Sequence, residues 1–196
     1  MTATPLVLAS ASPRRKQLLE MLGIPVIVRP SHIPEVHDPS EDPAAYVERL
    51  ARGKAEAVAA ELGDPAAMVL GADTTVALEH HLLEKPADAD DAVRMLRTLQ
   101  GRTHEVLTAV ALVAGGRTRH AVDVTRVTFR AADDDYLRAY VATGEPMDKA
   151  GAYGIQGYGA ALVERVEGDF FGVMGLPLRL VLRLMEEAGR GYRFGR

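Results

Sequence analysis

Short apolar runs alternate with segments of helical character along the first third of the chain. The runs at residues 6–9, 26–28 and 68–70 are continuous enough to form buried strands. A helix that begins at Ser12-Pro13 separates the first two runs, and a longer helix over residues 42–62 separates the second from the third. This alternation predicts an α/β fold.

The rest of the chain continues the alternation with longer strands. Residues 103–113 and 118–129 flank Gly115-Gly116, and this pattern predicts a long antiparallel hairpin. Further predicted elements are a hairpin over residues 75–84 with its turn at 79–81, helices over 88–99 and 133–141, paired strands over 162–166 and 171–173, and a last helix from Pro177.

Composition narrows the class of protein. A chain of 196 residues suffices for one large domain or two small lobes that share a core. The absence of cysteine excludes a disulfide framework, thiolate catalysis and a cysteine zinc site, and it fits a reducing, cytoplasmic compartment. The net charge of -4 disfavours nucleic acid as a partner. We expect neither a signal peptide nor a membrane span, because no apolar run approaches about 20 residues.

The first candidate site lies where the strand at residues 6–9 meets the following helix. Free N–H groups at a helix start favour an anion. Ser10 and Ser12 offer hydroxyl groups, and Arg14 and Arg15 offer guanidinium forks for phosphate oxygens. The alternative is an ordinary capped helix with two solvated arginines.

The second and third candidates are Lys54 and Asp73-Thr74. Lys54 falls on the apolar stripe of its helix, where a lysine needs an anionic partner, although it could instead extend its ammonium group to solvent. Asp73 follows the apolar run at residues 68–70, and the carboxyl ends of strands are common ligand sites. Asp73 could bind a metal or accept a proton; the alternative is a turn aspartate.

The fourth candidate is the glycine-rich stretch over residues 148–157. Glycine lets a backbone approach a ligand closely, and Asp148, Lys149 and Gln156 supply polar groups there. The alternative is a flexible loop with incidental polar residues. The histidines show no metal-ligand spacing, and no P-loop motif exists in the chain.

Several of these segments together resemble a known family. The stretches LVLASASPRRKQLLEMLGI, LARGKAEAV, VLGADTTVAL, LLEKPADADDAVRMLRTLQGRTHEVLTAVAL and EPMDKAGAYGIQGYGAALVERVEGDFFGVMGLPL occur in the order found in Maf-like nucleotide pyrophosphatases. The resemblance runs from about Leu6 to Leu184. It implies a single α/β domain over residues 1–196, with an elongated mixed sheet flanked by helices, two lobes and a central cleft, as in inosine-triphosphate pyrophosphatases.

The resemblance also implies a reaction and a set of residues. A nucleoside triphosphate would be split into the monophosphate and pyrophosphate, with Mg or Mn as the divalent cation and a homodimer as the assembly. Asp73 would accept the proton, with Lys54 and Lys85 as further catalytic residues. The expected substrate-binding positions are Ser10, Ser12, Arg14, Arg15, Thr74, Asp148, Lys149 and Gln156, and the expected metal ligands are Glu35 and Asp73.

Two motifs indicate the subgroup. The GADT motif ending in Thr74 and the IQG motif around Gln156 resemble the branch that acts on dTTP, UTP and modified uridine triphosphates. The alternatives are a 7-methyl-GTP or other purine triphosphate pyrophosphatase, and a nucleotide-binding regulator of septum formation. One departure is that the acidic pair often found in this family's Ile-Asp-Glu segment is reduced to Glu35 by Pro34.

Overall fold

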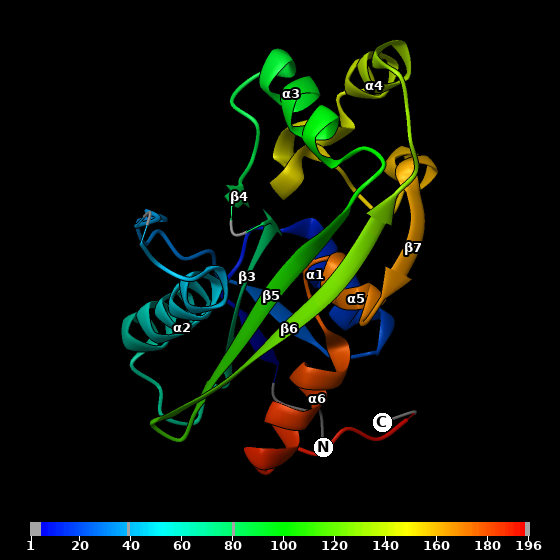
Figure 1. Cartoon of the computed structure of the whole chain (residues 1–196). Coiled ribbons are helices and arrows are strands. Elements are labelled where there is room, and N and C mark those ends of the chain that lie inside the picture. The colour runs from blue at the N-terminus through cyan, green and yellow to red at the C-terminus, as the bar shows by residue number, and fades with distance from the viewer. Residues whose placement is uncertain (1–4, 39, 80, 195–196) are drawn as a thin grey trace. The chain divides into compact units, whose positions relative to one another are not determined.

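The order of elements matches most of the predicted alternation. The computed structural model describes residues 5–38, 40–79 and 81–194 (Figure 1). The elements are β1 (Leu6–Leu8), α1 (Pro13–Met21), β2 (Val26–Val28), α2 (Pro43–Leu62), β3 (Val69–Leu78), β4 (His81–Leu83), α3 (Ala89–Leu99), β5 (Thr103–Ala114), β6 (Arg117–Phe129), α4 (Asp134–Val141), the short 3-10 helices η1 (Glu145–Asp148), η2 (Ala150–Ala152) and η3 (Tyr158–Leu162), β7 (Val163–Glu167), α5 (Phe170–Val173) and α6 (Leu178–Glu187).

The strands form a mixed sheet, as predicted. Within the described residues it has seven strands in the order β2-β1-β3-β5-β6-β7, with β4 paired to β3. Strand β1 pairs in parallel with both neighbours, so that Leu8 faces Val28 on one side and Leu70 on the other. The pairs β3–β4 and β6–β7 are antiparallel. All three residues of β1 are buried, as a continuous apolar run in a parallel strand requires.

The chain folds into two compact units. Unit 1 comprises residues 1–73, 108–123 and 175–196, and unit 2 comprises residues 74–107 and 124–174. Strands β3, β5 and β6 each contribute residues to both units. That residues 1–196 form a single domain with a central cleft stays a prediction.

Helix α2 is the longest helix of unit 1, and local signals define both of its ends. The Asp42 side chain accepts hydrogen bonds from Ala44 N and Ala45 N, Pro43 occupies the first turn, and Gly63 ends the helix with a φ of 62°. The predicted helix over residues 42–62 is therefore confirmed. Its buried face includes Lys54.

Gly71 lets α2 lie directly against β3. A Cβ atom at Gly71 would collide with the Ala51 carbonyl oxygen and would lie 2.8 Å from Ala55 N. Both of those atoms belong to the α2 backbone, which cannot move aside without moving the helix. The close approach places the β3 residues that follow Gly71 beside the middle of α2.

The core of unit 2 contains an aromatic group around a buried histidine. The His104 ring packs edge-on against Phe129 and Tyr153 with centroids 4.9 and 5.4 Å apart, and its Nε2 lies 2.8 Å from the Tyr153 hydroxyl. Burial lowers the pKa of His104 to about 4, so the imidazole is neutral at pH 7. His104 is therefore a structural residue of this core.

The prediction that a strand ends at Asp73 was wrong. Strand β3 continues from Val69 to Leu78, so Asp73 lies inside a strand. Glycine and aspartate are both unfavourable in isolated strands, but the pairing of β3 with its neighbours outweighs that local preference. The predicted hairpin forms between β3 and β4 through Glu79, and its His80 position lies outside the described residues.

The predicted strand over residues 171–173 was also wrong. These residues belong to the short helix α5. The Asp169 carboxylate accepts hydrogen bonds from Phe171 N and Gly172 N at 2.9 and 3.1 Å, which is an N-cap arrangement. The predicted partner strand forms as β7 and pairs with β6 instead.

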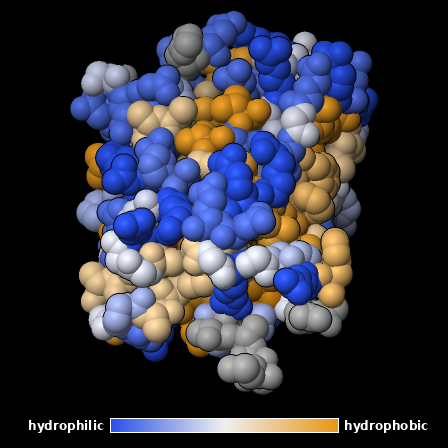
Figure 2. Space-filling model, turned by 90° about the horizontal axis from the view of Figure 1, so that it is seen from below, coloured by the Kyte–Doolittle hydropathy of each residue, from blue (hydrophilic) through white to orange (hydrophobic). Residues whose placement is uncertain are grey.

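Large apolar side chains are scattered over the surface. Met21, Ile27 and Val36 are exposed, and the face in Figure 2 shows hydrophilic and hydrophobic residues interspersed. Among the described residues, no helix combines the length and the apolar character that crossing a membrane requires.

We expect Gly71→Ala to lower the free energy of unfolding by about 2 kcal/mol or more, because the added methyl group forces α2 away from β3. Urea denaturation measures the change. Gly191→Ala is the control, since a Cβ atom at Gly191 meets nothing within 4 Å. Equal stabilities of the two variants would contradict the close approach.

We expect acid to destabilise unit 2 through His104. Its pKa is about 4 in the fold against 6.5 in the unfolded chain, so the unfolded chain binds the proton more readily and stability falls as the pH drops from 6.5 to 4. The loss amounts to roughly 3 kcal/mol. Urea melts across this range should show a shallower pH dependence in His104→Gln. The exposed His81→Gln variant should keep the steep loss, and the same shallow curve in both variants would refute this account.

Candidate functional site

A buried lysine lies between two carboxylates in unit 1. Lys54 Nζ donates to Asp73 Oδ1 at 2.6 Å and forms an ion pair with Glu35 Oε1, also at 2.6 Å. The side chains of Lys54 and Asp73 are 9% and 10% exposed, so this ion pair is almost fully removed from water. The predicted anionic partner of Lys54 is therefore confirmed, and the alternative of a solvent-directed lysine is wrong.

Three separate segments bring this cluster together. Lys54 comes from α2, Asp73 from β3 and Glu35 from the irregular segment between β2 and α2. The contact between Lys54 and Asp73 depends on the close approach at Gly71, two residues before Asp73 on the same strand. The predicted proton acceptor thus sits beside the predicted catalytic lysine.

Burial dominates the electrostatics of Asp73. It raises the pKa of the Asp73 carboxyl, while the charges of Lys54 and Arg15 and the Lys54 hydrogen bond oppose the rise without cancelling it. A carboxylate with a raised pKa is a stronger base than a surface aspartate. Asp73 is therefore suited to accept a proton from water.

The start of α1 forms a second polar cluster in unit 1. Arg15 Nη1 donates to Ser10 Oγ at 3.0 Å, Arg15 Nε donates to the Gly175 carbonyl at 2.9 Å, and Ser12 N donates to Ser10 Oγ at 3.2 Å. Burial lowers the pKa of Arg15, and the negative charge of Asp73 opposes that change. Arginine stays charged even when it is buried, so these hydrogen bonds hold a cationic guanidinium in one orientation at the start of α1.

The N-terminus of α1 suits an anion. Its first turn carries Arg14 and Arg15 and no acidic residue, and no capping hydrogen bond from the Ser12 side chain occurs in the described structure. Both arginines are partly buried, so the interpretation as two fully solvated arginines is wrong.

The remaining candidate residues belong to unit 2. Thr74 lies in β3 next to Asp73, and the alternation of a strand directs its side chain to the opposite face. Lys85 is exposed between β4 and α3, and Asp148 is exposed at the end of η1. Gly151 N donates to the Glu84 carbonyl at 3.1 Å, which joins the glycine-rich stretch to the residue before Lys85.

Lys149 is less exposed than Asp148 beside it. Its Nζ donates to the Glu145 carbonyl at 2.5 Å and to Asp148 Oδ1 at 2.6 Å, and its side chain is 13% exposed. Gln156 is exposed in the same glycine-rich stretch. Within unit 2 the structure therefore groups Asp148 with Lys149, while the roles expected for Thr74, Lys85 and Gln156 stay predictions.

The donor chemistry fits a divalent cation bound together with substrate. Glu35 and Asp73 both direct a carboxylate oxygen at one point, the Lys54 ammonium. Among the described residues, no three His, Cys, Asp or Glu side chains gather into a group that could hold a metal ion alone. Magnesium is often held by one or two carboxylates, with substrate phosphates and water completing the shell, and this pair matches that pattern.

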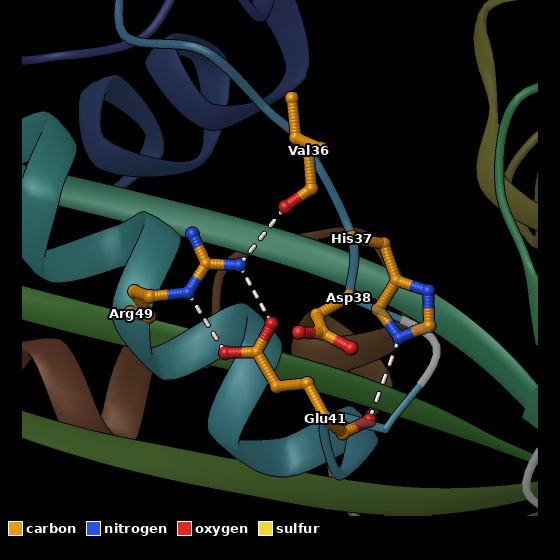
Figure 3. Close-up of a pocket in the computed structure, with 5 residues that line it drawn as sticks. All are labelled: Val36, His37, Asp38, Glu41 and Arg49. Carbon is orange, nitrogen blue, oxygen red and sulfur yellow. Dashed lines mark hydrogen bonds and ion pairs between the residues drawn. The ribbon is translucent and has the colours of Figure 1, made fainter.

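A pocket of about 690 Å³ lies just beyond Glu35 in unit 1, lined by Val36, His37, Asp38, Glu41 and Arg49 (Figure 3). The Arg49 guanidinium donates to both Glu41 carboxylate oxygens, at 2.8 and 2.6 Å, and to the Val36 carbonyl at 3.0 Å. We call these three hydrogen bonds the Glu41–Arg49 clasp. They connect the backbone after Glu35 to α2, the helix that also carries Lys54. Sequence analysis missed the clasp, because Glu41 and Arg49 look like ordinary surface residues.

Nearly the whole chain is similar to known proteins. The family model described as Maf-like protein matches residues 5–188. A dTTP/UTP pyrophosphatase of Moorella thermoacetica is 56% identical over 92% of this chain and 93% of its own length. A dTTP/UTP pyrophosphatase of Koribacter versatilis is 52% identical over 94% of both chains.

A solved structure agrees on the fold. The Ham1 protein of Staphylococcus aureus superposes with a TM-score of 0.50 over 82% of this chain and 80% of its own, at 14% sequence identity. At that identity the likeness concerns the fold alone, and it supports the predicted α/β architecture.

We expect Lys54→Met to lower the free energy of unfolding at pH 7 by about 3 kcal/mol, because it leaves Asp73 buried without its counter-charge. The pKa of Asp73 is already raised in the fold, and removal of Lys54 raises it further. The folded state then binds the proton more readily than the unfolded state, so the deficit should shrink as the pH falls through that pKa.

Urea denaturation at several pH values tests this expectation. The double variant Lys54→Met/Asp73→Asn should recover most of the free energy of unfolding that Lys54→Met loses at pH 7. Lys16→Met is the control, since Lys16 forms an exposed pair with Glu20 and should change stability by less than about 0.5 kcal/mol. A deficit that does not vary with pH would show that Asp73 is not the group left unpaired.

Proposed function

The chain belongs to the Maf-like protein family, and on that premise we propose that it hydrolyses dTTP and UTP to the nucleoside monophosphate and pyrophosphate. Relatives that share about half of its residues over nearly the whole length bear the name dTTP/UTP pyrophosphatase. The structural observation that carries the proposal is the buried Lys54–Asp73 pair in the same unit as Ser10 and Arg15.

The reaction joins a water oxygen to the α-phosphorus and breaks the bond from that phosphorus to the oxygen bridging to the β-phosphorus. Asp73 accepts the proton that the attacking water loses, since burial has raised the pKa of its carboxyl. Pyrophosphate leaves with the bridging oxygen and its negative charge. Little covalent chemistry is required of the protein, so positioned charges carry most of the catalysis.

Cations of unit 1 stabilise the charge that develops on the phosphates. Arg15 is oriented by Ser10 and Gly175, and the N-terminus of α1 adds its backbone N–H groups. Lys54 holds Asp73 in place and neutralises part of the carboxylate charge of the cluster. These charged groups are already in position before the water attacks, so they need little rearrangement during the reaction. Charge that is positioned in advance is the basis of electrostatic catalysis.

Glu35 and Asp73 would hold a Mg or Mn ion, which would supply further positive charge to the phosphate oxygens. The remaining assignments are further contacts with the substrate. Gln156 would contact the base, because its amide both donates and accepts hydrogen bonds, as the edge of uracil or thymine does. Lys85 and Lys149 would contact phosphates, with Thr74, Arg14, Ser12 and Asp148 as further substrate contacts. The homodimer and the cytoplasmic location stay predictions.

We expect Asp73→Asn to lower kcat for pyrophosphate release from dTTP by about 100-fold or more, because the amide cannot accept the water proton. Steady-state release of pyrophosphate measures the effect, and the exposed Asp64→Asn variant is the control. Full activity of Asp73→Asn would remove Asp73 from the proposed role.

The substrate class is tested with the wild-type protein. Purified protein with magnesium or manganese should release pyrophosphate from dTTP and UTP in preference to other nucleoside triphosphates. Release from 7-methyl-GTP or inosine triphosphate alone would keep the reaction and overturn the pyrimidine assignment. Binding of nucleotide without any release would favour a regulatory binding protein.

A further inference from the structure

The loop that carries Gln156 has little regular structure of its own. It connects η2 to η3 and contains Gly154 and Gly157, of which Gly157 has a φ of +102°, and Gly159 follows in the first turn of η3. Glycine loses more backbone freedom on ordering than any other residue. A loop of this composition therefore needs specific contacts to adopt one conformation.

A single carboxylate, that of Glu145, supplies several of those contacts. Its Oε2 accepts a hydrogen bond from Tyr158 N at 2.8 Å, and its Oε1 accepts one from Gly159 N at 2.9 Å. Oε1 also accepts a hydrogen bond from the Tyr140 hydroxyl at 2.9 Å. A Cβ atom at Gly157 would collide with Oε2, so the backbone passes directly over the carboxylate.

Tyr140 extends the same network to the start of the loop. Its hydroxyl accepts a hydrogen bond from Gly154 N at 3.1 Å while it donates to Glu145. Burial raises the pKa of Tyr140 well above its ordinary value, so the hydroxyl keeps the proton that it donates. A Cβ atom at Gly159 would lie 2.6 Å from the Tyr140 oxygen, so only glycine fits there.

Glu145 also contacts Lys149 through its backbone. The Glu145 carbonyl accepts a hydrogen bond from Lys149 Nζ at 2.5 Å. A Cβ atom at Gly154 would lie 2.8 Å from Lys149 Cε, so the lysine side chain packs against the first glycine of the loop. Glu145 thus contacts the C-terminal end of the Gln156 loop and the neighbouring Lys149 directly, and it reaches Gly154 at the start of the loop through Tyr140, all within unit 2.

We propose that Glu145 is a positioning residue that holds residues 154–159 in one conformation and thereby sets the base preference of the enzyme. The proposal rests on the proposed function, in which Gln156 contacts the base. A loop ordered in advance lowers the entropy that binding must overcome, and it holds Gln156 in one place. Loss of Glu145 therefore weakens substrate binding and base discrimination more than it slows the chemical step.

Glu145→Gln tests the proposal with the least change in shape. Both Glu145 oxygens accept backbone N–H groups, so an amide must direct its NH₂ group at one of these donors. We expect KM for dTTP and UTP to rise about tenfold while kcat changes less than about threefold, with a reduced preference for dTTP and UTP over other triphosphates. Hydrogen exchange at the Tyr158 and Gly159 amides should become faster.

Asp169→Asn is the matched control in the same unit. Asp169 receives two backbone N–H groups on one oxygen, Oδ1, which an asparagine retains. We expect this variant to keep the wild-type KM and base preference. Equal kinetic changes in the two variants would show that loss of a carboxylate charge, and not loss of the loop contacts, is responsible, and would overturn the proposal.

Tyr140→Phe is the second test and serves if Glu145→Gln fails to fold. It removes only the hydroxyl that joins Gly154 to Glu145, and we expect faster exchange at Gly154 with a smaller rise in KM. Unchanged KM and base preference despite faster exchange would overturn the positioning role. Unchanged exchange would show that these contacts do not hold the loop.

Failure of the proposed function gives a different result. A wild-type protein that releases no pyrophosphate from dTTP or UTP would refute that function without deciding the role of Glu145. Equilibrium binding of dTTP to the wild type and to Glu145→Gln then decides it. A Kd that rises about tenfold supports the positioning role, and equal Kd values overturn it.

Discussion

The ion pair between Lys54 and Asp73 is the interaction on which the candidate site depends. Transfer of both charges out of water is costly, and the attraction between them offsets part of that cost. The pair exists because Gly71 lets β3 approach the backbone of α2. Packing between a helix and a strand therefore determines the chemistry of the carboxylate.

The same burial has opposite consequences for stability and for reactivity. It raises the pKa of Asp73, and this makes the ionised carboxylate both a less stable group in the fold and a better base. Glu35 adds a second carboxylate to the Lys54 ammonium, and the Arg15 charge also acts on Asp73, so the carboxylate charges of the cluster are largely balanced by nearby cations.

The two units hold their polar groups in different ways. In unit 1 Asp73 projects from a strand and Lys54 and Arg15 project from helices, and an ion pair joins Lys54 to Asp73. In unit 2 Lys149 and Gln156 lie on glycine-rich backbone, and a network around Glu145 orders it. The proposed chemistry on the triphosphate thus rests on residues of helices and a strand, and the proposed contact with the base rests on a loop that Glu145 holds in one conformation.

The sequence by itself determined the elements that local signals define. Asp42-Pro43 and Gly63 bound α2, Gly115-Gly116 turn the long hairpin, and the apolar stripe of α2 placed Lys54 on its inward face. These features depend on residues close together in the chain, so their pattern is visible without the fold. The same holds for the family motifs, which are contiguous stretches of sequence.

Only the tertiary structure decided which distant residues meet. Asp73 lies within β3 because its neighbouring strands pair with it. The Glu41–Arg49 clasp and the contacts of Glu145 with Tyr158 and Gly159 join residues that look like solvated surface groups in the sequence. A hydrogen bond between segments leaves no periodic signal in either one, because its geometry exists only after both have packed.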